Sequence, residues 1–385
     1  MRFDLTEEQQ LIRDSVKEFV QSEVAPLAAE IDRDHRPPLE TIPKLAELGL
    51  LGMFVPPEYS GAGLDPLSYV IAVEEIAKAC ATTAVMVEAH NSLATWPILH
   101  YGTEDQKRTY LPGLATGETM GAFGLTEPGA GTDAAAQSST AVPTEDGYLL
   151  NGQKAFITGA GYAKVFVVFA RTSTDGPAHK GISAFIVDRD LPGFEIGEGE
   201  RKLGIRASST PPLMFSDVHL PKSALLGEEG QGFGIAMRAL DGGRIGIAAQ
   251  ALGIAEGALS AATDYARQRV QFGRPISSLQ AIQWMLADMA TEIEAGRLLV
   301  YQAAWLESQG LPYSTAGAMA KLFCGQMASR VAGKAIQVHG GNGYTEAYPV
   351  ERAYRDAKIT EIYEGTNEVQ RMVIAKSLLK STRRA

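Results

Sequence analysis

Apolar residues recur at the spacing of an α-helix through the first part of the chain. The pattern covers residues 6–31, 39–48, 68–79 and 82–100, and Thr6 and Gln9 stand at the spacing of a capping box before the first helix. No segment before about residue 117 has the pattern of a strand. These features predict an N-terminal α-helical domain over residues 1–118.

The pattern changes to short apolar runs between residues 119 and 230. The runs at 148–150, 165–170, 182–187 and 213–215 are separated by turn sequences such as Asp146-Gly147. Strands joined by hairpin-type turns, with no helix between them, favour an antiparallel sheet or a small barrel over βαβ units. We therefore expect a central antiparallel β-domain over residues 119–230.

Long helical patterns return in the last part of the chain, at 234–269, 279–309, 314–339 and 366–379. Helices of this length joined by short loops indicate an antiparallel bundle. The sequence thus predicts a C-terminal four-helix bundle domain over residues 231–385 and an α+β fold in the order helical, β, helical.

Composition argues against several classes of function. The 385 residues carry 35 Lys and Arg against 45 Asp and Glu, so a nucleic-acid binder is not expected. Two distant cysteines, and six histidines without a pair at ligand spacing, support neither a disulfide framework nor a metal site. No apolar run approaches the roughly 18 residues of a membrane span. We expect a cytoplasmic protein or, from a eukaryote after removal of a presequence, one of the mitochondrial matrix.

The segment FGLTEPGAGTD at residues 123–133 places two glycines beside the hydroxyl residues Thr126 and Thr132. Backbone N–H groups in such a loop can bind a phosphate or the polar edge of a ring. A tight turn between two domains is the alternative. The segment lacks the third glycine and the strand–helix setting of a Rossmann fingerprint, which argues against a nicotinamide cofactor.

Two further segments combine glycine with polar residues. The sequence GQKAFITG at residues 152–159 could place one face against a planar cofactor, although alone it is typical of an ordinary strand. The sequence LDGGR at residues 240–244 interrupts a helical pattern, and a helix N-terminus with an ion pair would explain it.

Two predicted helices end in unusual sequences. Residues 267–273, RQRVQFG, combine arginines with a terminal glycine; the arginines could complement the helix dipole or make forked contacts to phosphate. Residues 337–343, QVHGGNG, hold three glycines, more than the end of a helix needs. This suggests that the backbone closely approaches another group, which the sequence does not identify.

Glu364 lies in the segment EIYEGTNE at residues 361–368, before a helix that Thr366 or Asn367 could cap. A carboxylate in an apolar pocket is a candidate general base, because desolvation raises its pKa towards neutral pH. A solvated loop glutamate is the alternative.

In order, spacing and helical–β–helical setting, these segments resemble the acyl-CoA dehydrogenase family over nearly the whole chain, including YGTEDQK at residues 101–107. The resemblance implies FAD bound between the β-domain, the C-terminal bundle and a neighbouring subunit. Members of the family often have Trp at the position of Phe156; Phe keeps a stacking face but lacks the indole donor.

Carried over residue by residue, the resemblance also implies the binding residues. The expected FAD contacts are Phe123, Leu125, Thr126, Gly131, Thr132, Phe156, Ile157, Thr158, Arg269, Gln280, Gln337, Gly340, Gly341, Thr366, Asn367 and Glu368. The expected acyl-CoA contacts are Thr132, Asp241, Arg244 and Gly365. Arg269 would reach the FAD pyrophosphate across a subunit interface.

The implied reaction removes two hydrogens from an acyl-CoA and gives a trans-2-enoyl-CoA. Glu364 would take the α-proton while the β-hydride goes to flavin N5, and an electron-transferring flavoprotein would reoxidise the flavin. Some branches of the family place the base near residue 243; here that residue is Gly243, which leaves Glu364. A homotetramer built as a dimer of dimers is expected.

The substrate stays open at this stage. Residues 91–93, 243–248 and 360–366 look most like the short-chain, butyryl-CoA branch, and short branched-chain members share some of them. Three alternatives remain: the same fold acting as a flavin oxidase or on carrier-protein-bound acyl groups, a non-enzymatic helical scaffold, and a nicotinamide enzyme.

Overall fold

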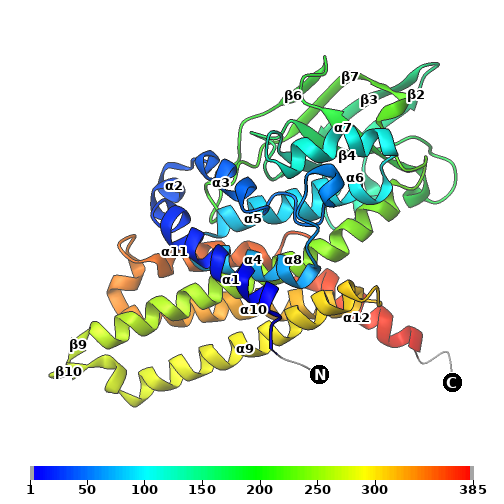
Figure 1. Ribbon diagram of the computed structural model, residues 1–385. Helices are drawn as coiled ribbons and strands as arrows, with labels where there is room; N and C mark the ends of the chain where they lie inside the picture. The colour runs from blue at the N-terminus through cyan, green and yellow to red at the C-terminus, as the bar shows by residue number, and fades with distance from the viewer. Residues whose placement is uncertain (1–3, 382–385) are drawn as a thin grey trace.

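The computed structural model describes residues 4–381 and has a β-rich part stacked on two layers of helices (Figure 1). The N-terminal helices are α1 (Glu7–Phe19), α2 (Ala28–Asp34), α3 (Ile42–Glu47), α4 (Pro66–Ala79), α5 (Ala81–Ala89), α6 (Trp96–Tyr101) and α7 (Glu104–Ala115). The capping box of Thr6 and Gln9 is confirmed. A second capping box, of Thr103 and Gln106, starts α7, which the apolar pattern did not predict.

The central part of the chain forms one eight-stranded sheet. Its strands are β1 (Gly121–Gly124), β2 (Thr140–Pro143), β3 (Gly147–Lys154), β4 (Val165–Arg171), β5 (Ile182–Asp188), β6 (Phe194–Ile196), β7 (Leu213–Pro221) and β8 (Leu225–Leu226). The order is β6-β7-β3-β2-β4-β5-β8, with β1 paired to β4. The four strand runs expected from the sequence are confirmed in β3, β4, β5 and β7.

The expectation of a purely antiparallel sheet is wrong, because β4 pairs in parallel with β1 and with the start of β2. Parallel neighbours need a connection that crosses over rather than a hairpin turn. The long loop after β1 and the β2–β3 hairpin provide such connections, and neither has a helical pattern that would announce it in the sequence.

β4 is buried on both faces of the sheet. Val165, Val167 and Phe169 pack in the cluster that contains residues of α6, α7 and α8. The alternate residues Phe166 and Val168 pack in the cluster on the other face. Burial of both faces explains why residues 165–170 are a continuous apolar run rather than an alternating one.

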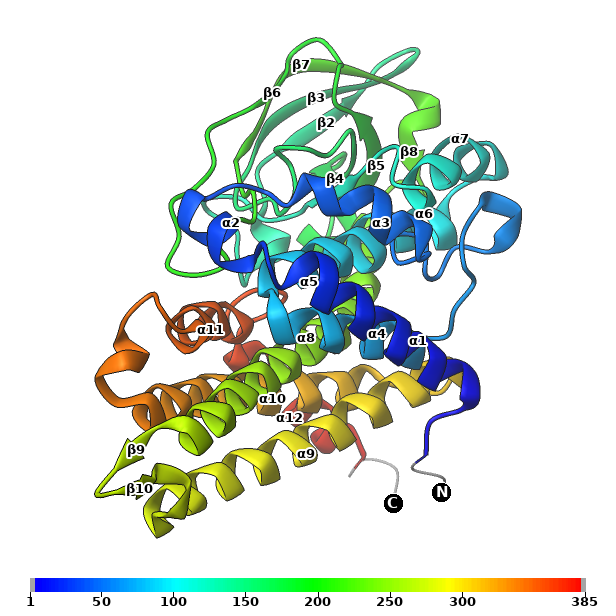
Figure 2. The ribbon, with the colours of Figure 1, turned by 60° about the vertical axis from the view of Figure 1, so that its left-hand side comes forward.

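The C-terminal part is helical, as predicted. It contains α8 (Gly232–Gln268), α9 (Gln280–Ser308), α10 (Ser314–His339), α11 (Pro349–Ala357) and α12 (Asn367–Ser381). A two-stranded hairpin, β9 (Val270–Gln271) with β10 (Arg274–Pro275), joins α8 to α9 and projects from the body in both views (Figures 1 and 2). Neither this hairpin nor α11 was expected from the sequence.

The long helix α8 corrects two expectations. It runs unbroken through residues 240–244, so no helix begins there, although the expected ion pair is present between Arg244 and Asp241. It also contains an 18-residue window apolar enough to cross a membrane by composition, contrary to the expectation that no such run exists. Because 72% of that window is buried inside the protein, it is accounted for as a core helix.

Glycines on α8 allow this close packing. A Cβ added at Gly253 would lie 2.3 Å from the carbonyl oxygen of Glu74, and one at Gly257 would lie 2.1 Å from that of Lys78. The absence of side chains here therefore brings the backbone of α8 against that of α4.

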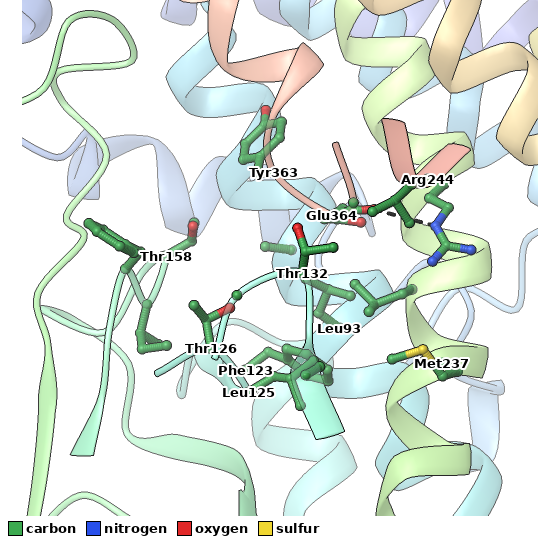
Figure 3. Close-up of a pocket in the computed structure, with 18 of the residues that line it drawn as sticks. Leu93, Phe123, Leu125, Thr126, Thr132, Thr158, Met237, Arg244, Tyr363 and Glu364 are labelled. Atoms are coloured by element: carbon green, nitrogen blue, oxygen red, sulfur yellow. Dashed lines mark hydrogen bonds between the residues drawn. The ribbon is translucent and has the colours of Figure 1, made fainter. Parts of the chain in front are cut away.

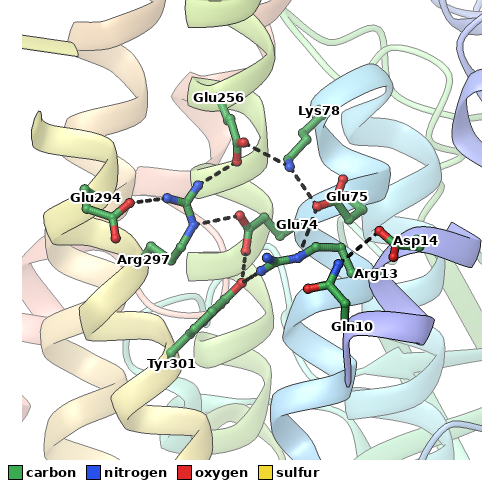
Figure 4. Close-up of polar contacts among 10 residues, drawn as sticks. All are labelled: Gln10, Arg13, Asp14, Glu74, Glu75, Lys78, Glu256, Glu294, Arg297 and Tyr301. Carbon is green, nitrogen blue, oxygen red and sulfur yellow. Dashed lines mark hydrogen bonds and ion pairs between the residues drawn. The ribbon is translucent and has the colours of Figure 1, made fainter. Parts of the chain in front are cut away.

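A charged network ties the N-terminal helices to the bundle (Figure 4). Arg297 of α9 pairs with Glu74 of α4 at 3.1 Å and with Glu256 of α8 at 2.8 Å. Lys78 of α4 pairs with the same Glu256 at 3.0 Å. One cluster of charges thus joins three helices from distant parts of the sequence.

Candidate active site

A mostly apolar cavity lies where the β-domain, α5, α8 and the segment before α12 meet (Figure 3). It is lined by Val85, Ala89, Leu93, Phe123, Leu125, Thr126, Gly131, Thr132, Ala134, Phe156, Ile157, Thr158, Met237, Leu240, Arg244, Tyr363, Glu364, Gly365 and Val369. In Figure 3, Glu364 and Arg244 lie on one side of the cavity and Thr158 on the other. Four of the segments singled out in the sequence therefore meet here.

Two cations hold the backbone that carries Glu364. Glu364 and Gly365 have φ angles of 53° and 98°, which turn the chain sharply before α12. Arg244 Nε donates to the Glu364 carbonyl oxygen at 3.3 Å, and Lys321 Nζ donates to the Gly365 carbonyl oxygen at 2.6 Å. A left-handed conformation at a non-glycine residue is strained, and these hydrogen bonds help to hold it.

The Glu364 carboxyl group has the character of a general base. Its Oε2 atom is buried and has no hydrogen-bond donor among the described residues. Burial raises the pKa of Glu364 to about 7, although the Glu88 side chain, Lys321 and Arg244 act to lower it. A carboxyl group with a pKa near neutral pH can both accept and release a proton at working pH.

Gly243 leaves room for this carboxyl group. A Cβ added at Gly243 would lie 2.1 Å from Glu364 Oε2 and 3.2 Å from a methyl carbon of Leu93. The Glu364 side chain therefore occupies the space that any larger residue at position 243 would need.

A buried ion pair joins the two β-domain loops that line the cavity. Lys154 Nζ lies 2.7 Å from Glu127 Oε1, and both side chains are almost fully buried. Glu127 also accepts hydrogen bonds from the backbone N–H groups of Ser138 and Ser139. Burial acts to raise the pKa of Glu127, but Lys154, Ser138 and Ser139 lower it to about 2. The pair fixes Thr126 on one loop relative to Phe156 on the next.

Of the expected substrate residues, Thr132, Arg244 and Gly365 line the cavity. Asp241 does not line the cavity but lies behind Arg244, whose Nη1 donates to it at 2.5 Å. Thr366 Oγ1 accepts from the Val369 N–H at 3.4 Å and so caps α12, as one of the two expected alternatives. Asn367 is buried with its Oδ1 atom unpartnered among the described residues, and Glu368 is exposed.

The other expected FAD residues lie elsewhere in the chain. Arg269 lines a separate depression together with Tyr265 and His339. Gln280 is exposed at the first position of α9. Gln337, Gly340 and Gly341 are exposed at the end of α10. Within one chain the structure does not bring these residues to the cavity that contains Glu364.

Sequence reasoning missed two buried ionisable residues at this site, Glu88 of α5 and Lys321 of α10. Each is a lone ionisable residue in an apolar helical run, and that pattern could have identified it as a candidate. Among residues 4–381 no group of His, Cys, Asp and Glu is arranged to hold a metal ion.

The cavity fits the ring of a flavin. Phe156 has a φ angle of 59° and is 63% exposed, so its aromatic face stands free at the cavity wall. A Cβ added at Gly129 or Gly131 would meet nothing within 4 Å, so this backbone faces open space. Apolar walls with the hydroxyl groups of Thr126 and Thr158 suit a flat ring with polar edges. Fold and cavity together favour a flavin-dependent oxidoreductase.

Comparison with known families identifies the branch. The acyl-CoA dehydrogenase N-terminal domain matches residues 6–118, the middle domain residues 122–218 and the C-terminal domain residues 230–379. The chain belongs to the acyl-CoA dehydrogenase family, which confirms the resemblance seen in the sequence. It is an acyl-CoA dehydrogenase, and its cofactor is FAD.

Individual relatives match along their full length. The chain is 54% identical to "Acyl-CoA dehydrogenase, short-chain specific" of Clostridium acetobutylicum, over 99% of this chain and 100% of the relative. The solved structure of butyryl-CoA dehydrogenase from Megasphaera elsdenii matches with a TM-score of 0.96 and 48% identity, over 98% and 100% of the two chains. A chain from a study of the electron transferring flavoprotein of Acidaminococcus fermentans matches with a TM-score of 0.97 and 53% identity, over 98% and 100%.

Proposed function

We propose that this enzyme converts a short-chain acyl-CoA, straight or short-branched, to the trans-2-enoyl-CoA, with Glu364 as the base that removes the α-proton. The observation that carries the proposal is the Glu364 carboxyl group, whose Oε2 atom is buried in an apolar cavity against Gly243. Burial brings its pKa to about 7, where a carboxylate is basic enough to remove a weakly acidic proton.

The chain's own residues have three tasks in this reaction. Glu364 takes the α-proton, and its backbone N–H, which no described residue accepts from, can donate to the thioester oxygen as negative charge develops. The apolar walls exclude water, which keeps the base reactive. FAD, when bound, would supply the acceptor for the hydride that leaves the β-carbon.

The proposed FAD contacts fall into two sets. Thr126 would bond the ring edge, and Phe156 to Thr158 would cover the opposite face from Phe123 to Thr132. Arg269, Gln280 and residues 337–341 would bind the pyrophosphate and adenosine of FAD in a second copy of the chain, because they lie apart from the cavity in their own chain. Thr366, Asn367 and Glu368 would lie beside the cofactor.

The proposed acyl-CoA contacts are Thr132, Asp241, Arg244 and Gly365. Arg244 is the central residue of this set, since it lines the cavity and contacts both Asp241 and the Glu364 backbone. The preference for short chains rests on the resemblance of residues 243–248 and on the name of the Clostridium relative.

We also propose a homotetramer and reoxidation by an electron-transferring flavoprotein. Large apolar side chains remain exposed in one chain: Val270, Phe272, Trp284, Leu298, Trp305 and Met372. They lie on the β9–β10 hairpin, α9 and α12, where a second copy could cover them. The acceptor is suggested by the similar chain from Acidaminococcus, which comes from work on an electron transferring flavoprotein. The boundaries at residues 118 and 230 and the cellular compartment stay predictions.

The variant Glu364→Gln tests the base. We expect it to bind FAD and acyl-CoA but to lose flavin reduction by at least about 10⁴-fold, because an amide cannot accept the α-proton. Anaerobic flavin bleaching against a panel of acyl-CoA lengths and branches measures both the loss and the substrate preference. Bleaching of the variant at the rate of the wild type would refute the proposal.

The same experiment separates a dehydrogenase from an oxidase. After anaerobic reduction by butyryl-CoA, the bleached enzyme is mixed with air and hydrogen peroxide is measured. Slow peroxide formation is expected. Rapid formation would instead assign an oxidase.

A further inference from the structure

Glu88 is a buried acid next to the proposed base. It lies on α5 with no exposed surface, in a helix whose other residues are all buried. Its Oε1 atom accepts from Ser92 Oγ at 2.7 Å and from Tyr69 OH at 3.4 Å. Among residues 4–381 no Lys, Arg or His forms an ion pair with it. An ionised carboxylate buried without a cation is costly, so the neutral acid is favoured here.

The carboxyl groups of Glu88 and Glu364 face the same side of α8. A Cβ at Gly243 would lie 2.1 Å from Glu364 Oε2, and a Cβ at Gly246 would lie 2.9 Å from Glu88 Oε1. Residues three apart in a helix lie on one face, so the two carboxyl groups occupy neighbouring places. The Oε2 atom of each is buried without a partner among the described residues, and each of the two carboxyl groups shifts the pKa of the other.

We propose that Glu88 is a protonated carboxylic acid that donates a hydrogen bond to the Glu364 carboxylate and so keeps the base ionised and oriented in the resting enzyme. This rests on the proposed role of Glu364 as the base. Glu88 is thus a positioning residue, which acts on the substrate only through Glu364.

The surrounding charges determine which acid holds the proton. Two carboxyl groups in contact cannot both be ionised in a buried site, so the pair holds one proton. Arg244 of α8 and Lys321 of α10 act on Glu364 and favour its ionised form. On the side of Glu88, Tyr69 of α4 and Ser92 are neutral donors, and burial followed by the Glu364 charge raises the pKa of Glu88 well above its ordinary value. Desolvation and the charges of Glu88 and Glu364 raise the pKa of the nearby Tyr363 well above its ordinary value, so Tyr363 stays neutral.

This arrangement suits the proposed proton transfer. Before the reaction, the pair carries one proton and one negative charge. When the α-carbon–hydrogen bond breaks and an oxygen–hydrogen bond forms on Glu364, both acids are neutral. The base therefore accepts a proton without creating a buried charge at the pair.

Two substitutions at Glu88 separate donation from mere packing. Glu88→Gln keeps the shape and an N–H donor towards Glu364, whereas Glu88→Met keeps the length and removes the donor. In Glu88→Met we expect the acid limb of the pH profile of flavin reduction by butyryl-CoA to move to higher pH by at least about one unit. The rate of the variant should then be about tenfold below that of the wild type at low pH and equal to it at high pH. In Glu88→Gln the limb should move by less than about half a unit.

Glu307→Gln is the matched control. Burial raises the pKa of Glu307 of α9 to about 7, but Glu307 is not among the groups that shift the pKa of Glu364. Its substitution should leave the limb in place. A limb that moves to lower pH in both Glu88 variants would show that Glu88 is ionised, and an unchanged limb in Glu88→Met would show that it donates nothing; either result overturns the proposal.

Infrared difference spectra between each FAD-loaded variant and the FAD-loaded wild type report which carboxyl group is protonated, without turnover. A protonated-carboxyl band should be lost in Glu88→Gln and kept in Glu364→Gln. The reverse assignment would place the proton on Glu364 and overturn the proposal. Failure of the base assignment is distinct, because it would appear as normal flavin reduction in Glu364→Gln whatever the infrared result.

Discussion

At the scale of single residues, the site depends on the lack of a side chain at Gly243. Gly243 and its neighbour Gly242 both lie within α8, but their surroundings differ. A Cβ at Gly243 would overlap the Glu364 carboxyl group, whereas one at Gly242 would lie 3.5 Å from Glu307 Oε1, an ordinary contact. The two glycines form a matched pair for testing how far the reaction depends on the placement of Glu364.

We expect Gly243→Ala to slow flavin reduction by about 10²-fold, because displacing a base by about 1 Å has an effect of that size. Alanine also favours the helix by about 1 kcal/mol over glycine, which offsets part of the free-energy cost of the overlap, so any loss of stability should be smaller than that cost. Anaerobic stopped-flow reduction measures the rate and thermal unfolding measures stability. Gly242→Ala is the control, and comparable slowing in both variants would argue against the specific overlap.

At the scale of elements, the pair of Glu127 and Lys154 connects the loop after β1 to the end of β3. Removing one partner leaves the other as a buried, unpaired charge. We expect Glu127→Ala to lower the free energy of unfolding by about 3–5 kcal/mol and to weaken FAD retention. Urea unfolding of the purified enzyme measures the first effect, and flavin fluorescence released on dilution measures the second.

Two controls qualify this prediction. Glu195→Ala removes an exposed carboxylate on β6 and should change stability by less than about 0.5 kcal/mol. The double variant Glu127→Leu with Lys154→Met removes both charges and should recover much of the loss. A double variant as unstable as Glu127→Ala would contradict the explanation by an unpaired charge.

At the scale of the whole molecule, Asp356 of α11 joins the C-terminal helices to the β-domain, where its Oδ1 atom accepts from the Ile205 N–H at 2.5 Å. Burial raises the pKa of Asp356 to about 7, although the Ile205 hydrogen bond acts to lower it. The contribution of Asp356 to the free energy of unfolding is therefore fully present below the unfolded-state pKa of about 3.9. It is lost as pH rises through about 7.

We therefore expect Asp356→Asn to flatten the dependence of stability on pH between about pH 4 and pH 7. The free energy of unfolding of the variant minus that of the wild type should rise by up to about 4 kcal/mol from the low to the high end of this window. Urea midpoints across the range measure it. Asp175→Asn, in an exposed turn, is the control, and parallel profiles for Asp356→Asn and the wild type would contradict the prediction.

The assembly itself is tested at Arg269, which is exposed near the β9–β10 hairpin and apart from the cavity of its own chain. We expect Arg269→Ala to weaken FAD binding by about tenfold or more, because a charged hydrogen bond to phosphate contributes about 1.5–3 kcal/mol. Equilibrium dialysis of FAD measures it. Arg267→Ala removes an exposed arginine that pairs with Asp264, and equal losses in both variants would argue against a specific contact.

Helices and strands with strong periodic patterns could be predicted, whereas local signals alone did not predict α7, α11 or the parallel pairing of β4 with β1. The capping box of Thr103 was readable in the sequence, but its helix has a weak apolar pattern, because several of its residues are charged or polar. Parallel pairing depends on contacts between segments about 40 residues apart, and no local pattern specifies them.

The sequence by itself determined the order of helical and β parts, the family, and Glu364 as the candidate base, because these depend on periodicity and on local motifs. Only the tertiary structure decided what surrounds Glu364. Glu88, Arg244 and Lys321 come from three different helices, and their effect on the proton affinity of Glu364 depends on distance and burial. Such quantities arise only when the chain is folded and water is excluded, so no stretch of sequence encodes them alone.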